Sequence, residues 1–177
     1  MTCHPATPAK LTRGIAIDIA RQQDGSIRIR YDVDAPPGGL KLGKPGKPER
    51  RDQLWQTTCF EAFVREAGKV GYLEFNFAPS SAWAAYSFAD YRSDMVDLPM
   101  ASLPELSYDG DQSHFAFIAM FELPPALRDA NLQMAITAVI EERDGTKSYW
   151  SLTHPVGAPD FHHPDCFTLR LPARARS

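Results

Sequence analysis

Apolar and polar residues alternate along several short stretches of this chain, with a period of two that is typical of β-strands. The run GIAIDIA at residues 14–20 alternates in this way, and so does SIRIRYDV at residues 26–33. The QQDG segment between them has the composition of a turn, so the two runs predict a β-hairpin. Further strand-like runs are predicted at residues 57–65, 72–78, 113–121, 132–140, 148–153 and 166–171.

The remaining segments contain little that predicts helix. Residues 35–51 are too rich in Pro and Gly for regular structure and predict a long basic loop. The run SSAWAAYSFADYR fits either a strand or a helix with Trp83 and Tyr86 on one face. Residues 124–130 predict one or two helical turns that begin with prolines. Eight or nine short strands, with no repeat and no second composition block, indicate a single all-β domain, either a sandwich or a barrel.

Two of the predicted strands carry glutamates. Side chains on a strand point alternately to its two faces. The rows Phe60–Ala62–Val64 and Leu73–Phe75–Phe77 are wholly apolar and predict core faces. The short EAGKVG segment predicts an antiparallel hairpin, which places Glu61, Glu74 and Asn76 together on the opposite face. That face is interpreted either as a solvent face, which antiparallel sheets commonly have, or as a ligand-binding face.

Aromatic residues favour the ligand-binding interpretation. Trp55, Trp83, Tyr86 and Tyr91 lie near the glutamates in sequence, and Arg92 follows them. Carboxylates and amides bind hydroxyl groups, and flat rings stack on C–H faces, so this combination is typical of a saccharide site. The competing interpretation places Trp83 and Tyr86 in the core, because aromatic side chains bury much apolar area.

The same carboxylates leave an enzymatic alternative open. Directly opposed residues on neighbouring strands have Cβ atoms roughly 4.5–5.5 Å apart. Glu61 and Glu74 are therefore candidates for a carboxylate pair of the kind used in glycoside hydrolysis, unless they are solvated or bridged by Arg92. Cys59 shares the face of Glu61, but a neighbouring carboxylate raises the pKa of a thiol and opposes thiolate chemistry. We therefore predict no catalytic residue.

Composition and charge narrow the classes of partner. The chain has 177 residues, 44% hydrophobic and 23% charged, and its formal net charge is -3 at pH 7. This charge gives no general attraction to nucleic acid or anionic lipid, so neither a nucleic acid nor a membrane is expected as a partner. No segment predicts a signal peptide or a membrane span. Three cysteines without a CxxC pair favour free thiols in a reducing compartment, and we expect a cytoplasmic protein.

The segment HPVGAPDFHHPDCF, residues 154–167, contains the densest set of potential metal ligands. Its histidines are His154, His162 and His163. Their spacing matches no established closed metal site, and two prolines indicate a loop whose polar residues cap turns. We therefore predict no metal and keep these three histidines as weak candidates. His154 and His162 are alternatively hydrogen-bond donors to a ligand at the sheet edge.

Three blocks of sequence resemble a known family. They are DQLWQTTCFEAF at residues 52–63, YLEFNFAPSSAWAAYSFADYR at residues 72–92, and YWSLTHPVGAPDFH at residues 149–162. Together they resemble bacterial DOMON-like proteins, which are similar to family nine carbohydrate-binding modules and to haem- or sugar-binding DOMON domains. The resemblance covers roughly residues 10–171. It implies an antiparallel two-sheet β-sandwich, immunoglobulin- or jelly-roll-like, with little helix and with a ligand site on or beside one sheet.

The resemblance also implies two kinds of ligand. Sugar-binding relatives clamp the sugar between aromatic rings, for which Trp55, Trp83 and Trp150 are the matching residue types. Cytochrome-type relatives hold haem between a Met and a His. The corresponding methionines are Met95, Met100, Met120 and Met134, but no motif selects a pair, so haem is a minority alternative and no cofactor is predicted.

The sequence therefore predicts a single β-sandwich domain, residues 1–177, that acts as a non-catalytic small-molecule-binding module. A saccharide or related polyhydroxylated compound is the expected ligand. The alternatives are a glycan-processing or metal-assisted hydrolase, a haem-binding DOMON domain and a protein-interaction sandwich. The predicted ligand-binding residues are Trp55, Glu61, Glu74, Asn76, Trp83, Tyr86, Arg92, Trp150 and His154.

Overall fold

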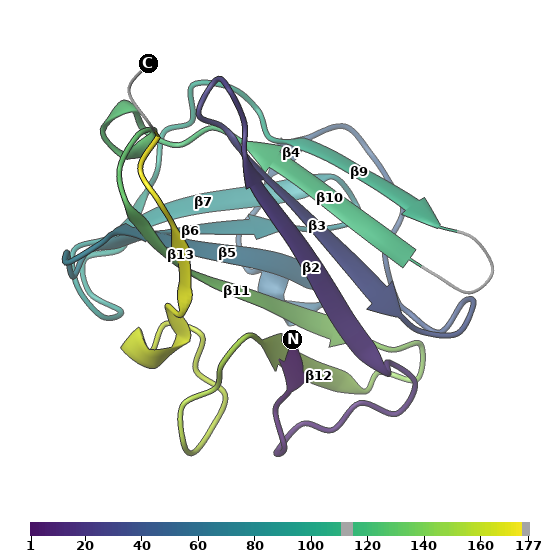
Figure 1. The fold of residues 1–177 in the computed structure, drawn as a ribbon. Helices are drawn as coiled ribbons and strands as arrows, with labels where there is room; N and C mark the ends of the chain where they lie inside the picture. The colour runs from purple at the N-terminus through teal and green to yellow at the C-terminus, as the bar shows by residue number, and fades with distance from the viewer. Residues whose placement is uncertain (111–114, 175–177) are drawn as a thin grey trace.

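A computed structural model describes residues 1–110 and 115–174 of the chain (Figure 1). Its regular structure consists of strands and three short 3-10 helices. The strands are β1 (Thr2–Cys3), β2 (Gly14–Arg21), β3 (Ile27–Asp34), β4 (Glu49–Arg50), β5 (Cys59–Glu66), β6 (Tyr72–Phe77), β7 (Ala82–Phe88), β8 (Val96–Asp97), β9 (Glu105–Gly110), β10 (Phe115–Phe121), β11 (Leu132–Glu141), β12 (Lys147–Ser151) and β13 (Leu169–Leu171). The 3-10 helices are η1 (Leu54–Gln56), η2 (Pro125–Leu127) and η3 (Pro164–Cys166). In the described part of the chain, no helix has the length and apolarity to cross a bilayer.

Two sheets pack face to face. The large sheet has the order β1-β12-β11-β5-β6-β7-β4, with β13 beside β11 and β8 beside β7. The small sheet has the order β2-β3-β10-β9 and lies across one face of the large sheet (Figure 1). All strand pairs are antiparallel except β4 with β7. The predicted two-sheet antiparallel β-sandwich with little helix is confirmed.

The core between the sheets follows from the alternation in the sequence. Strand β3 contributes alternate buried side chains, and the apolar rows of β5 and β6 face them. The ring of Phe60 stacks on that of Phe117, with 4.6 Å between centroids, and lies 4.7 Å from that of Tyr31. The Tyr31 hydroxyl donates a hydrogen bond of 2.9 Å to the backbone carbonyl of Glu61, which satisfies its polar end within the core.

The other face of the large sheet is also buried, which corrects the expectation of a solvent face. A second apolar cluster lies there, formed by outward-facing side chains of β5, β6, β7 and β11 together with Leu54 of η1 and residues from the C-terminal segment. Phe161, Cys166 and Phe167 belong to that segment and are buried against the sheet. The large sheet is therefore the middle of three layers.

Most predicted strands are observed, and the run SSAWAAYSFADYR forms β7 and the turn after it. Trp83 faces the core and Tyr86 the opposite face, because their positions differ by an odd number within a strand. Four strands were missed, namely β1, β4, β8 and β9, and β4 interrupts the predicted loop at residues 35–51. The predicted strand 113–121 is observed from Phe115, and its first two residues lie outside the described residues.

We expect Phe60→Ala to destabilise the protein by about 3–5 kcal/mol, because it removes a fully buried ring that contacts both sheets. Equilibrium denaturant unfolding measures this difference. As a control, Val96→Ala removes methyl groups from a side chain that is 59% exposed, and should change the free energy of unfolding by less than about 0.5 kcal/mol. A loss below about 1 kcal/mol for Phe60→Ala would contradict the assigned core.

Candidate functional site

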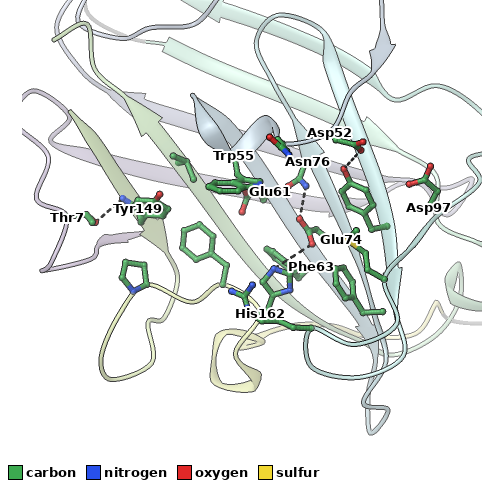
Figure 2. Close-up of a pocket in the computed structure, with 18 residues that line it drawn as sticks. Thr7, Asp52, Trp55, Glu61, Phe63, Glu74, Asn76, Asp97, Tyr149 and His162 are labelled. Carbon is green, nitrogen blue, oxygen red and sulfur yellow. Dashed lines mark hydrogen bonds and ion pairs between the residues drawn. The ribbon is translucent and has the colours of Figure 1, made fainter. Parts of the chain in front are cut away.

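A pocket of about 990 Å³ opens on the outer face of the large sheet (Figure 2). Strands β5, β6, β7 and β11 form its floor. The segment around η1, the turn before β8 and the loop before η3 form its walls. The lining residues are Thr7, Asp52, Gln53, Trp55, Glu61, Phe63, Glu74, Asn76, Tyr86, Phe88, Arg92, Met95, Asp97, Val139, Tyr149, Pro159, Phe161 and His162.

Glu61, Glu74 and Asn76 lie together on the pocket floor, on one face of β5 and β6 as predicted. They are 3%, 7% and 2% exposed, so of the two interpretations left open by the sequence, the structure does not support a solvent face. Glu61 is opposite Asn76 and Glu74 is opposite Phe63. The two glutamates are therefore diagonal neighbours, and the directly opposed geometry considered from the sequence is not formed.

Neutral donors satisfy part of each carboxyl group. The Asn76 side-chain amide donates to Glu74 Oε1 at 2.7 Å, and the Thr137 hydroxyl donates to Glu61 Oε2 at 2.9 Å. Burial raises the pKa of Glu61 to about 8, and the nearby charge of Glu74 adds to this, against the opposing hydrogen bond from Thr137. Burial also raises the pKa of Glu74, although its bond to Asn76 and the charge of Arg92 oppose the shift.

His162 closes one side of the floor. Its Nδ1 lies 2.7 Å from the Tyr72 hydroxyl. Its Nε2 lies 3.8 Å from Glu74 Oε2 (Figure 2). Burial lowers the pKa of His162 to about 4, and the charge of Arg92 lowers it further, so the ring is neutral at pH 7. The Tyr72 hydroxyl accepts from the Arg92 backbone N–H at 3.2 Å, which leaves its own proton to donate to Nδ1. From this network we assign the ring proton to Nε2, which faces Glu74.

Arg92 holds the wall of the pocket together. Its guanidinium donates to Asp160 Oδ1 at 2.7 Å, and the Tyr91 hydroxyl donates to Asp160 Oδ2 at 2.5 Å. Although burial acts to raise the pKa of Asp160, these two bonds hold it below its usual value. Arg92 thus forms an ion pair with Asp160. It does not bridge Glu61 and Glu74, which was one alternative considered from the sequence. It joins the turn after β7 to the loop before η3.

Aromatic side chains form much of the rest of the lining. Trp55, on η1, is 48% exposed, whereas Tyr86 and Phe161 are largely buried. The Tyr86 hydroxyl donates to Asp52 Oδ1 at 2.7 Å, which ties the segment before η1 to the floor (Figure 2). The pocket therefore combines an accessible indole with buried polar groups.

Of the nine predicted ligand-binding residues, the structure brings six to this pocket. They are Trp55, Glu61, Glu74, Asn76, Tyr86 and Arg92.

Three predicted residues lie elsewhere. Trp83 shares the inward face of β7 and is buried in the core. Trp150 also lies in the core, where its indole N–H donates to the Ser148 hydroxyl at 2.9 Å. His154 Nε2 lies 3.0 Å from the backbone carbonyl of Thr2, outside the pocket lining. Strand parity places the two tryptophans between the sheets, where a ligand in this pocket does not reach them.

Several lining residues were not predicted. Asp52, Tyr149 and Phe161 lie inside the three sequence blocks quoted above. Their place in those blocks is the one feature of the sequence that could have identified them as site residues. Thr7 and Asp97 lie in segments that carried no motif.

The histidines do not form a metal or haem site. Among residues 1–110 and 115–174, no group of three or more His, Cys, Asp or Glu side chains is arranged to hold a metal ion. His162 and Met95 both line the pocket, but both ring nitrogens of His162 face protein partners. The Nδ1 of His163 accepts from the Asp165 backbone N–H at 3.2 Å. These residues therefore do not fit axial ligation of haem.

No protein-family model and no curated protein matches this chain. Its fold is similar to the crystal structure of a protein from Bacteroides uniformis that is provisionally described as carbohydrate-binding. The TM-score is 0.61 at 14% sequence identity, and the match covers 93% of this chain and 79% of the other. At this identity the similarity establishes the class, a β-sandwich protein, and the fold alone.

We expect Glu61→Gln to flatten the pH dependence of stability. The pKa of Glu61 is raised from 4.5 to about 8, so between these values the folded state holds a proton that the unfolded state releases. Stability therefore falls as pH rises through this window, by on the order of 2–5 kcal/mol. Glutamine mimics the protonated acid, so the variant should match the wild type near pH 5 and exceed it in stability near pH 8.5.

Denaturant unfolding at a series of pH values measures this effect. Glu66→Gln is the matched control, because Glu66 lies at the exposed end of the same strand. Parallel pH profiles for the wild type and Glu61→Gln would refute the assignment of a protonated Glu61.

Proposed function

We propose that this chain is a non-catalytic module that binds a saccharide, or another polyhydroxylated small molecule, in the pocket on the large sheet. The observation that carries the proposal is the combination, in one cavity of about 990 Å³, of an accessible Trp55 with the buried Glu74 and Asn76. This volume lies at the upper end of the usual range for small-molecule sites.

The chemistry of the lining suits hydroxyl groups. Glu74 uses Oε1 to bind Asn76, and its Oε2 has only the longer 3.8 Å contact with His162. Glu61 accepts from the Thr137 hydroxyl through Oε2, and the Cys59 thiol also donates to its carboxyl group. The carboxyl groups of both glutamates line the cavity. A sugar hydroxyl donates to such oxygens, and the C–H face of the ring packs on an indole such as that of Trp55.

The thiols of Cys59 and Cys166 do not favour covalent catalysis. Burial raises the pKa of the Cys59 thiol well above its usual value, and Glu61 raises it further. Burial likewise raises the pKa of Cys166 to about 11. Both thiols are therefore protonated near neutral pH and are poor nucleophiles.

A glycan-processing hydrolase is the second candidate, because a carboxyl group with a pKa of about 8 has the protonation state of a general acid. The arrangement opposes it, since both carboxyls lie on one floor and burial raises the pKa of Glu74 as well, which disfavours the ionised form that a partner base needs. We expect no turnover of chromogenic glycosides. Turnover that disappears in Glu61→Gln would replace the binding module with an enzyme.

The comparisons support this proposal at the level of fold. The Bacteroides protein has the same sandwich and is provisionally described as carbohydrate-binding. The resemblance of three sequence blocks to DOMON-like proteins, and to family nine carbohydrate-binding modules, points to the same class of ligand. We include that family membership and a cytoplasmic location in the proposal.

We expect saccharides to raise the thermal unfolding temperature of the wild type, because a ligand at a hundred times its Kd stabilises the folded state by about 2.7 kcal/mol. Trp55→Ala should weaken that binding at least about tenfold, or 1.4 kcal/mol, while changing stability by less than about 1 kcal/mol.

Tyr108→Ala is the matched control, because Tyr108 is 47% exposed on the small sheet and outside the pocket lining. Thermal shift and calorimetry with a panel of mono- and disaccharides make the measurement. Equal saccharide affinity in the wild type and Trp55→Ala would contradict the proposal that saccharides bind in this pocket.

A further inference from the structure

The pocket lining has an excess of acidic side chains. Arg92 is its one permanently charged cation among the described lining residues, and it is already paired with Asp160. His162 is neutral at pH 7, because burial lowers its pKa to about 4. The acidic lining residues are Asp52, Glu61, Glu74 and Asp97.

Two of these acids are buried without a cationic partner. Glu61 bonds to the neutral hydroxyl of Thr137, and Glu74 bonds to the neutral amide of Asn76 and faces the neutral ring of His162. Among the described residues, no Lys or Arg side chain forms an ion pair with either glutamate. A buried carboxylate without a cation is costly, so Glu61 keeps its proton near neutral pH, and a guest that supplies a cation favours the ionised form.

Asp52 and Asp97, the other two acidic lining residues, each have a partner outside the glutamate pair. Asp52 accepts from the Tyr86 hydroxyl, and Asp97 is largely exposed and lies 3.4 Å from an Arg50 nitrogen. The two carboxyl groups that lack an ion-pair partner among the described Lys and Arg side chains are therefore those of Glu61 and Glu74, on the floor of the cavity.

The aromatic lining is an independent observation that fits the same guest. The rings of Trp55, Phe63, Tyr149 and Phe161 line the cavity together with the two glutamates. Ring faces attract cations and offer nothing to anions. Carboxylates and aromatic rings around one cavity therefore select a protonated amine over a carboxylate or a phosphate.

We propose that the guest is a polyhydroxylated amine, such as an amino sugar, whose ammonium group lies between Glu61 and Glu74 while its hydroxyls meet the rest of the pocket. This inference rests on the proposed function and specifies its ligand class. The ammonium donates to the carboxyl groups of Glu61 and Glu74, which line the cavity, and on Glu74 it uses Oε2 because Asn76 already binds Oε1. Acidic sugars and sugar phosphates are disfavoured by the same carboxylates.

The test compares glucosamine, glucose, N-acetylglucosamine and methylammonium by isothermal titration calorimetry with the full chain. A pH of about 6.5 keeps the sugar amine protonated. Glucosamine should bind at least about tenfold more tightly than glucose or N-acetylglucosamine, because acetylation removes the charge and keeps the ring. The preference should weaken as salt is raised, although a buried pair is screened less than an exposed one.

Glu61→Gln and Glu74→Gln should each reduce the ratio of glucosamine affinity to glucose affinity to about one, and Glu66→Gln should leave it unchanged. The ratio separates loss of charge from a general change of pocket shape, which would weaken both sugars alike. Circular dichroism and thermal unfolding establish whether each variant is folded. If a variant does not fold, the comparison of the four ligands with the wild-type protein still tests the proposal.

The outcomes distinguish this inference from the proposed function. Equal affinity for glucosamine and glucose overturns the inference and leaves saccharide binding intact. Binding of methylammonium as tightly as glucosamine, with no binding of glucose, supports a cation site and overturns the saccharide proposal. Absence of binding by every probe overturns both.

Discussion

The large sheet is buried on both faces, and the properties of this molecule follow from that constraint. On one face the apolar row of β5 meets the small sheet, with Phe60 stacked on Phe117. On the other face the row that contains Cys59, Glu61 and Phe63 meets a covering layer from η1 and the C-terminal segment. In the middle of such a strand neither face meets bulk water, so Glu61 is held in the cavity between the sheet and its covering layer.

The covering layer depends on a few polar contacts. Asp160 receives the guanidinium of Arg92 and the hydroxyl of Tyr91, and Asp52 receives the hydroxyl of Tyr86. These contacts anchor the walls at the rim while the floor remains open to the cavity. Arg92 forms its ion pair with Asp160, so its charge opposes the raised pKa of Glu74 only from a distance and does not pair with either floor carboxyl. The geometry that keeps the pocket open is thus also the source of its acidity.

The strands and their faces could be predicted from the sequence, because alternation along β5 and β6 is a local property of the chain. The grouping of Glu61 with Glu74 and Asn76 followed directly. The burial of that group could not be predicted, because the segment that covers it is rich in prolines and has no period that indicates where it packs. The two-residue strands β4 and β8 are too short to leave a pattern.

The misplaced aromatics have a related explanation. Tryptophan is the residue type on which sugars stack, but it is equally common in hydrophobic cores. Residue type alone therefore did not show that Trp83 and Trp150 lie in the core. Because β7 is a strand and not a helix, Trp83 and Tyr86 point to opposite faces of the sheet, and Trp83 faces the core. For His162 the sequence offered a weak metal-ligand candidate, and the structure shows a neutral ring that is hydrogen-bonded to Tyr72 and has its Nε2 3.8 Å from Glu74 Oε2.

The short strand β4 has a further consequence, for association between molecules. It lies along β7 for only two residues, and the Arg50 side chain then donates to the backbone carbonyls of Ala85 and Leu98. The Arg50 guanidinium also lies 4.8 Å from the ring centroid of Trp83. A free strand edge is a template for pairing with another chain. Strands β4 and β8 and the Arg50 side chain occupy backbone groups along β7, and so leave less of this edge free to pair with another chain.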